Sequence, residues 1–237
     1  MKKLISLTLT LMTVMVMILG AKAIAVSPAR NPVAEEVETS IREGEAALKK
    51  SVASLPERNG VAAGISTNTS VSAASGEEKD AADSASVTAI GDSVLLGAAK
   101  ALQDEIDGIN VDAKESRQVK SAREIVSGMK KEGALGDTVI IALGTNGPFN
   151  IATGQALLDE IGHSRHIYWV LTYGKNLSWQ QDVNSTINEL AENNSNVRLI
   201  DWPAAATANP DWLYGDGIHL NPTGQKGYAE MIREAVE

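Results

Sequence analysis

Cysteine is absent from this 237-residue chain, and aromatic side chains are scarce and unevenly placed. The lack of cysteine excludes disulfide bonds, a thiolate nucleophile and any metal site with a cysteine ligand. All nine aromatic residues lie at or beyond Phe149, and residues 27–86 are instead rich in Ala, Ser, Glu and Asn. A segment of that composition buries too little apolar surface to offset its ordering entropy. We therefore expect residues 27–86 to be a low-complexity linker.

One part of that linker has a helical pattern. Val33, Val37, Ile41 and Leu48 are spaced so that one face of a helix would be apolar, which predicts a short amphipathic helix. The following stretch, residues 59–86, is dominated by Ala, Ser, Gly and Thr and is typical of a flexible spacer.

Positive charge is also in deficit, since the formal net charge is −9. This balance argues against nucleic acid or an anionic membrane surface as the main partner. No glycine-rich phosphate loop or dinucleotide fingerprint is present, so we expect no cofactor. His163 and His166 have no nearby carboxylate that would complete a metal site, and we expect none.

One long apolar run is present, at residues 4–19, and it follows two lysines. Two small-residue motifs come next, Ala21-Lys22-Ala23 and Ala23-Ile24-Ala25. A basic start, an apolar stretch and small residues are the parts of a secretory signal peptide. The run is also close to the length that spans a bilayer. We expect residues 1–26 to be a signal peptide or an apolar helical membrane anchor, and the protein to be extracytoplasmic, either secreted or anchored to the cell membrane.

From residue 87 onward, strand and helix patterns alternate. We expect strands at residues 87–90, 109–113, 138–143, 167–172 and 197–201, and helices at residues 94–106, 121–131, 153–161, 179–193 and 222–236. This alternation predicts an α/β domain over residues 87–237, a three-layer α/β/α sandwich with a five-stranded parallel sheet. Ligands bind to such sheets just beyond the carboxyl ends of the strands.

Ser93 lies at such an end, after Gly91 and at the start of a predicted helix. There its hydroxyl could serve as a nucleophile, while its backbone N–H faces a developing oxyanion. The alternative is an ordinary helix N-cap, in which Asp92 or Ser93 accepts a backbone N–H.

Asp216 and His219 lie in a turn before the last helix. A separation of three residues lets the carboxylate accept the ring Nδ1–H, which leaves Nε2 free to take a proton from a nucleophile. The alternative is a capping aspartate beside an exposed loop histidine.

Asn146 follows the third predicted strand and is flanked by Gly144-Thr145 and Gly147. Its side-chain amide could donate to the oxyanion of a tetrahedral intermediate. The alternative is an asparagine that simply tolerates turn geometry.

Taken together, these segments resemble the motif blocks of a known superfamily. Gly91-Asp92-Ser93-Val94, Gly144-Thr145-Asn146-Gly147 and Asp216-Gly217-Ile218-His219-Leu220 resemble, in order and spacing, those of the SGNH (GDSL-like) hydrolases. More closely, they are similar to the extracytoplasmic domains of bacterial cell-wall (peptidoglycan) O-acetyltransferases. The resemblance implies a flavodoxin-like fold with Ser93 as nucleophile, His219 as base and Asp216 as the residue that orients it. It also implies Asn146 and the Ser93 N–H as oxyanion donors.

One family block departs from its usual form. The second block normally supplies a glycine N–H to the oxyanion hole, but here Glu115-Ser116-Arg117-Gln118 stands after the second strand. We expect Ser116 to supply that donor. Gly144, Thr145, Gly147 and Tyr173 are expected to line the substrate cleft.

These features predict an acyl (acetyl) transferase or esterase that acts on cell-wall carbohydrate through an acyl-Ser93 intermediate. The acceptor is a carbohydrate hydroxyl in one case and water in the other, and the sequence leaves both open. A transferase would need an acetyl donor outside the cell, hence a separate multi-pass membrane partner. Two alternatives remain: a non-catalytic wall-binding module on the same fold, and a short-chain ester or lipid hydrolase.

Overall fold

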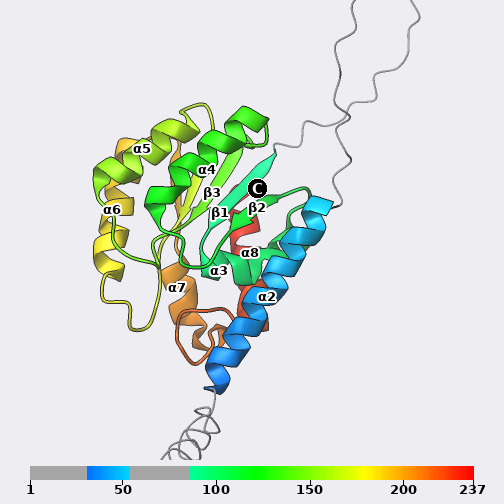
Figure 1. The fold of residues 1–237 in the computed structure, drawn as a ribbon. Coiled ribbons are helices and arrows are strands. Elements are labelled where there is room, and N and C mark those ends of the chain that lie inside the picture. Colours follow the sequence, from blue (N-terminus) through cyan, green and yellow to red (C-terminus); the bar gives the residue numbers. More distant parts are fainter. Residues whose placement is uncertain (1–30, 54–85) are drawn as a thin grey trace, which may run out of the picture. The chain divides into compact units, whose positions relative to one another are not determined.

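The computed structural model describes residues 31–53 and 86–237 (Figure 1). The apolar segment expected at residues 1–26 lies outside the described residues, as does all but Ser86 of the spacer expected at residues 59–86. Within the described residues, no helix combines the length and apolar character needed to cross a membrane. The chain divides into two units after Glu36, and the larger unit, Val37–Glu237, contains the whole sheet.

A five-stranded parallel sheet forms the centre of this unit, as the sequence predicts. Its strands are β1 (Val87–Gly91), β2 (Asn110–Ala113), β3 (Thr138–Ala142), β4 (His166–Val170) and β5 (Val197–Ile200), in the order β2-β1-β3-β4-β5. Gly91 at the end of β1 pairs with Ala113 of β2 and Ala142 of β3. The three strands therefore end level with one another, and the loops that follow them leave the sheet at one edge.

Helices cover both faces of the sheet (Figure 1). They are α3 (Ser93–Glu105), α4 (Val119–Glu132), α5 (Ile151–Ile161), α6 (Gln180–Asn193), α7 (Trp202–Ala208) and α8 (Pro222–Val236). Helices α3 and α8 share one buried apolar cluster with Ala89 and Ile140, whereas α4, α5 and α6 share the other with Ile90 and Ile141. Alternate residues of β1 and β3 thus pack into opposite cores, which explains why both strands are mostly apolar.

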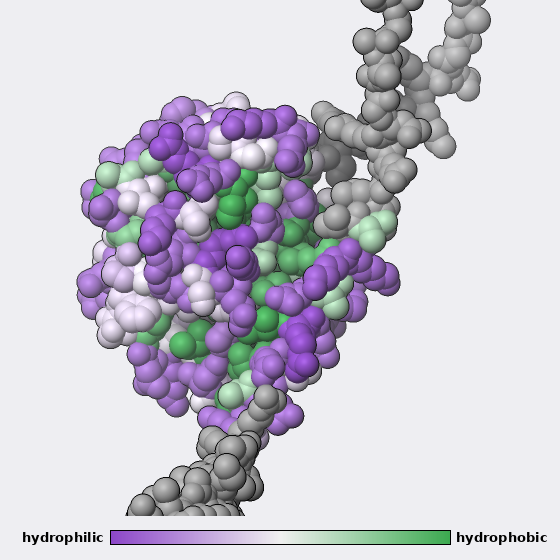
Figure 2. Space-filling view, viewed as in Figure 1, coloured by the Kyte–Doolittle hydropathy of each residue, from purple (hydrophilic) through white to green (hydrophobic). Residues whose placement is uncertain are grey.

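The outer surface of α4, α5 and α6 is largely hydrophilic (Figure 2). Such helices gain their stability by burying one apolar stripe against the sheet while the opposite side stays in water. The α/β architecture predicted from alternating periodicities is confirmed in this respect.

The segment after β5 differs from the expectation. It folds at once into α7 and then a short 3-10 helix, η1 (Pro210–Trp212), neither of which was predicted. The Asp201 side chain accepts the Ala204 N–H at 3.0 Å, and Pro203 lies in the first turn. This cap starts a helix where the sequence suggested only the end of a strand.

The sequence predicts a short amphipathic helix within the linker of residues 27–86, and α2 (Pro32–Ala53) lies there. Its 22 residues make it the longest helix of the described chain, and Ser40 and Ile41 on it are buried.

Candidate active site

Ser93 opens α3 immediately after β1. Asp92 is the N-cap of this helix, and its Oδ1 accepts the Val94 N–H at 3.0 Å. Because Asp92 performs the capping, the Ser93 hydroxyl is available for another partner, and its Oγ lies 3.0 Å from His219 Nε2. Ser93 is 8% exposed. The structure therefore brings the predicted nucleophile and the predicted base into hydrogen-bond contact.

Asp216 holds the His219 ring from the other side. Its Oδ2 lies 2.6 Å from His219 Nδ1, and its Oδ1 accepts the backbone N–H groups of Ile218 and His219 at 2.9 and 3.0 Å. The capping alternative does not describe this aspartate, because Asn221 caps α8 by accepting the Gly224 N–H at 3.0 Å. Asp216 instead ties the tight turn and the imidazole together.

The charge state of Asp216 follows from these bonds. Burial raises the pKa of Asp216, but the hydrogen bonds from the His219 ring and from two backbone N–H groups outweigh it, so the pKa lies below its usual range. Asp216 is thus ionised at neutral pH and only accepts hydrogen bonds. The His219 proton therefore sits on Nδ1, and Nε2 accepts from the Ser93 hydroxyl.

Asn146 lies in the turn after β3. Its side-chain Nδ2 donates to the backbone oxygen of Arg117 at 3.3 Å, and its backbone carbonyl oxygen accepts from Gln118 Nε2 at 2.9 Å. These two bonds join the turn to the loop after β2 and leave the second amide hydrogen of Asn146 for a ligand. Gly144 and Gly147, on either side, have φ values of 143° and 125°, which L-residues rarely adopt.

Ser116 lies in the loop after β2 and has an unusual backbone conformation. With φ at 57°, it is the one non-glycine residue with positive φ in residues 31–53 and 86–237. A left-handed conformation is where glycine is normally found, and it costs other residues about 1 kcal/mol or more. The motif block that this loop resembles usually has glycine, so Ser116 adopts a conformation typical of glycine. Arg117 beside it forms an ion pair with Asp112.

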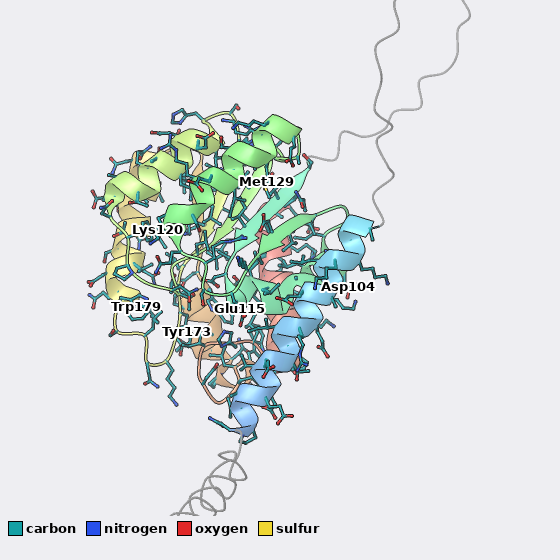
Figure 3. The ribbon with its side chains drawn as sticks, in the orientation of Figure 1. Asp104, Glu115, Lys120, Met129, Tyr173 and Trp179 are labelled. Atoms are coloured by element: carbon teal, nitrogen blue, oxygen red, sulfur yellow. The ribbon has the colours of Figure 1, made fainter. Side chains whose placement is uncertain are left out.

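Thr145 and Tyr173 line a narrow cavity of about 10 Å³ with Asp92, Trp202 and Tyr228. Tyr173 packs edge-on against Trp202, with ring centroids 6.4 Å apart. Gly147 borders a wider groove of about 370 Å³ between the starts of α4 and α5. Lys120 (Figure 3) lies on its α4 side and Phe149 on its α5 side. Across the described ranges, no group of three or more His, Asp or Glu side chains is placed to hold a metal ion.

The second carboxylate oxygen of Asp92 has an environment that no sequence motif indicates. This Oδ2 atom is buried and makes no hydrogen bond to the described part of the chain, and the residue is 1% exposed. Burial raises the pKa of Asp92 to about 6, against the opposing effects of the Val94 N–H, the neighbouring Thr145 and the charge of His219. A buried titratable carboxyl therefore lies on the residue that precedes Ser93.

This raised pKa predicts a pH-dependent stability. Since the pKa of Asp92 is higher in the folded chain than the ordinary value of 3.8, folding favours the protonated form. The stabilising contribution of protonated Asp92 to the free energy of unfolding is complete below pH ~4 and is lost as pH rises through ~6. In Asp92→Asn the cap remains but the ionisation does not. The variant should gain about 1–3 kcal/mol relative to wild type between pH 4 and pH 8.

Urea unfolding at the two pH values measures this gain, with exposed Asp211→Asn as the matched control. A difference between Asp92→Asn and wild type that stays constant from pH 4 to pH 8 would show that Asp92 does not titrate in this range.

The α/β fold and the order of the site segments are similar to those of the SGNH (GDSL-like) hydrolases. No family model matches the chain. Relatives at 35% identity include the peptidoglycan O-acetyltransferase OatA of Listeria monocytogenes, over 61% of this chain and 23% of that protein. The O-acetyltransferase OatA of Staphylococcus aureus matches over 62% of this chain and 24% of that protein. This chain thus spans about a quarter of the length of these curated relatives.

Solved structures agree with these relatives. The C-terminal catalytic domain of Streptococcus pneumoniae peptidoglycan O-acetyltransferase A, with a methylsulfonyl adduct, superposes with a TM-score of 0.59 at 28% identity. The match covers 64% of this chain and 92% of that domain. A lipolytic G-D-S-L family protein from Veillonella parvula shares the fold, with a TM-score of 0.52 at 15% identity, over 63% of this chain and 96% of that one. The homologues are therefore peptidoglycan O-acetyltransferases and the structural neighbours include GDSL hydrolases, which confirms the resemblance inferred from the sequence.

Proposed function

We propose that this protein is an extracytoplasmic O-acetyltransferase that acetylates a cell-wall carbohydrate through an acetyl-Ser93 intermediate. The observation that carries the proposal is the pair of contacts made by His219, 3.0 Å to Ser93 Oγ and 2.6 Å to Asp216 Oδ2. A serine hydroxyl becomes nucleophilic when a base removes its proton, and an ionised carboxylate stabilises the imidazolium that forms.

In the first half-reaction, the Ser93 Oγ attacks the carbonyl carbon of an acetyl ester while His219 Nε2 takes its proton. The tetrahedral intermediate carries a negative oxygen, which accepts hydrogen bonds from the free Asn146 amide hydrogen and the Ser93 N–H. The Ser116 N–H is the third donor in this proposal. The C–O bond to the leaving alcohol then breaks, the alcohol takes the proton back from His219, and acetyl-Ser93 remains.

In the second half-reaction, a carbohydrate hydroxyl gives its proton to His219 Nε2 and attacks acetyl-Ser93. The bond to Oγ breaks, Ser93 regains its proton and the sugar leaves as an acetyl ester. Water in place of the sugar would make the protein an esterase. The groove of about 370 Å³ beside Gly147 gives the acceptor a place to lie next to the oxyanion loop.

The names of the relatives support the cell wall as the location, since both act, as named, in O-acetyl transfer and one on peptidoglycan. Under this proposal the acetyl group reaches Ser93 from a separate membrane protein that supplies the donor ester. Secretion, or anchoring through residues 1–26, would place Ser93 on the outer side of the membrane. Thr145, Gly144, Gly147 and Tyr173 are proposed to border the bound substrate.

Replacing Asn146 by alanine is expected to lower kcat for acetyl-ester turnover about 10²–10³-fold, with little change in KM, because the amide meets the oxyanion only in the transition state. Steady-state kinetics measure the split, and Asn188→Ala, on the exposed side of α6, is the matched control. An unchanged kcat in Asn146→Ala would remove this residue from the oxyanion hole.

The overall proposal is tested with a chromogenic acetyl ester and chito-oligosaccharide acceptors, with acetylated sugar detected by mass spectrometry. Wild type should consume the ester and form acetylated sugar. Ester consumption that yields only acetate would make the protein an esterase. A folded wild type that neither consumes ester nor modifies sugar would favour the non-catalytic wall-binding alternative, and preference for longer acyl chains would favour the lipid hydrolase.

A further inference from the structure

Helix α2 packs on α3, which begins with Ser93, and on α8, which follows the turn that holds Asp216 and His219. Ser40 and Ile41 are 5% and 8% exposed, and Leu48 packs against the apolar cluster shared by α3 and α8. Figure 1 shows α2 on the side of the sheet where α3 and α8 lie, and its outward surface in Figure 2 is largely hydrophilic. α3 begins with Ser93, and α8 begins three residues after His219. Helix α2 therefore contacts the two helices that adjoin the catalytic residues.

The contact with α3 is a close crossing of two helix backbones. A Cβ atom at Gly44 would lie 1.9 Å from the carbonyl oxygen of Leu96, a distance that no packed atom tolerates. Across the same crossing, a Cβ atom at Gly97 would lie 3.1 Å from Ser40 Oγ. Leu96 lies in the first turn of α3, one turn from the nucleophile. The lateral position of that turn is thus set by the absence of a side chain at Gly44.

The contact with α8 is a polar bridge. Gln225 Nε2 donates to Ser40 Oγ at 2.9 Å and to Leu220 O at 3.3 Å. Both amide hydrogens of Gln225 are therefore used, one on α2 and the other on the residue that follows His219. Leu220 itself is 1% exposed and pairs with Leu213 in an isolated bridge. The Gln225 side chain consequently links α2 to the backbone next to His219.

We propose that α2 is a positioning element of the catalytic site, in which Gly44 sets the place of the Ser93 turn and the Ser40–Gln225 bridge sets the place of His219. This inference rests on the proposed function. The Ser93–His219 contact joins residues 126 positions apart in the chain. A displacement of about 1 Å between such groups lowers turnover by as much as about 10²-fold. The catalytic unit on this account includes α2 as well as residues 87–237.

Two variants test the two contacts separately in the full chain. Gly44→Ala forces α2 and α3 apart, with Gly128→Ala as its control because a Cβ atom at that α4 position meets nothing within 4 Å. Gln225→Leu removes both donated bonds at similar size, with exposed Gln181→Leu on α6 as its control. We expect each test variant to lower kcat for acetyl-ester turnover about tenfold or more, with KM within about twofold, at temperatures well below melting. The controls should keep wild-type kcat.

A second readout separates positioning from stability and from turnover itself. The His219 Nδ1 proton, bonded to Asp216, gives a proton NMR signal that should shift or broaden in Gln225→Leu and not in Gln181→Leu. If Gly44→Ala does not fold, Gln225→Leu and Ser40→Ala still decide the question. Wild-type kcat and an unmoved His219 signal in these variants would overturn the positioning role, whatever their melting temperatures. Absence of turnover in wild type would instead count against the proposed function, and the NMR signal alone would then decide the role of α2.

Discussion

Replacing Ser93 by alanine is expected to lower acetyl-ester turnover about 10⁴–10⁶-fold. Alanine removes the oxygen that lies 3.0 Å from His219 Nε2, so no acyl intermediate can form. The fold should be unaffected, since Asp92 rather than Ser93 caps α3. Steady-state kinetics measure the loss, and thermal melting verifies that the variant remains folded.

Ser178→Ala, at an exposed loop position, is the matched control and should retain wild-type turnover. Comparable turnover by Ser93→Ala and Ser178→Ala would mean that another group is the nucleophile.

Asp216→Asn should produce the second large loss, about 10³–10⁴-fold in kcat. The amide cannot supply the negative charge that stabilises protonated His219. An Asn amide that turned its NH2 toward the ring would favour the tautomer with the proton on Nε2, which cannot accept from Ser93. The bonds from the Ile218 and His219 N–H groups to Oδ1 can persist with the asparagine oxygen, so the turn should keep its shape.

The pH profile of Asp216→Asn and its melting temperature are measured beside those of Asp211→Asn. A loss of activity that parallels a loss of folded protein would assign Asp216 a structural role only.

Much of this architecture is readable from the sequence because burial on two faces leaves a clear pattern. The Thr138–Ala142 strand is mostly β-branched and is buried at every residue, so a strand buried on both faces of a parallel sheet could be predicted there. The α7 helix could not be, because it depends on one cap by Asp201 and has too few residues for periodicity to show. The apolar spacing of α2 predicts a helix there but does not say which surface it contacts.

Some features of the candidate site could likewise be predicted from the sequence, and others could not. The order of Ser93, Asn146, Asp216 and His219 at strand ends and turns suggested which residues would meet, since level strand ends bring their loops to one edge. The Oδ2 of Asp92, by contrast, is buried without a hydrogen-bond partner among the described residues because of how distant residues pack around a cavity. A local sequence pattern does not predict such packing. The bond from Gln118 to the Asn146 carbonyl joins residues 28 positions apart, and it too depends on the tertiary fold.

The central claim, that His219 and Asp216 make Ser93 a nucleophile, is tested most directly by covalent labelling with methanesulfonyl fluoride. Intact-protein and peptide mass spectrometry should find one methylsulfonyl group on wild type, located at Ser93. Asp216→Asn should label much more slowly, and Ser93→Ala should not label. A wild-type protein that stays unlabelled at Ser93, or that labels equally fast without Asp216, would contradict the account.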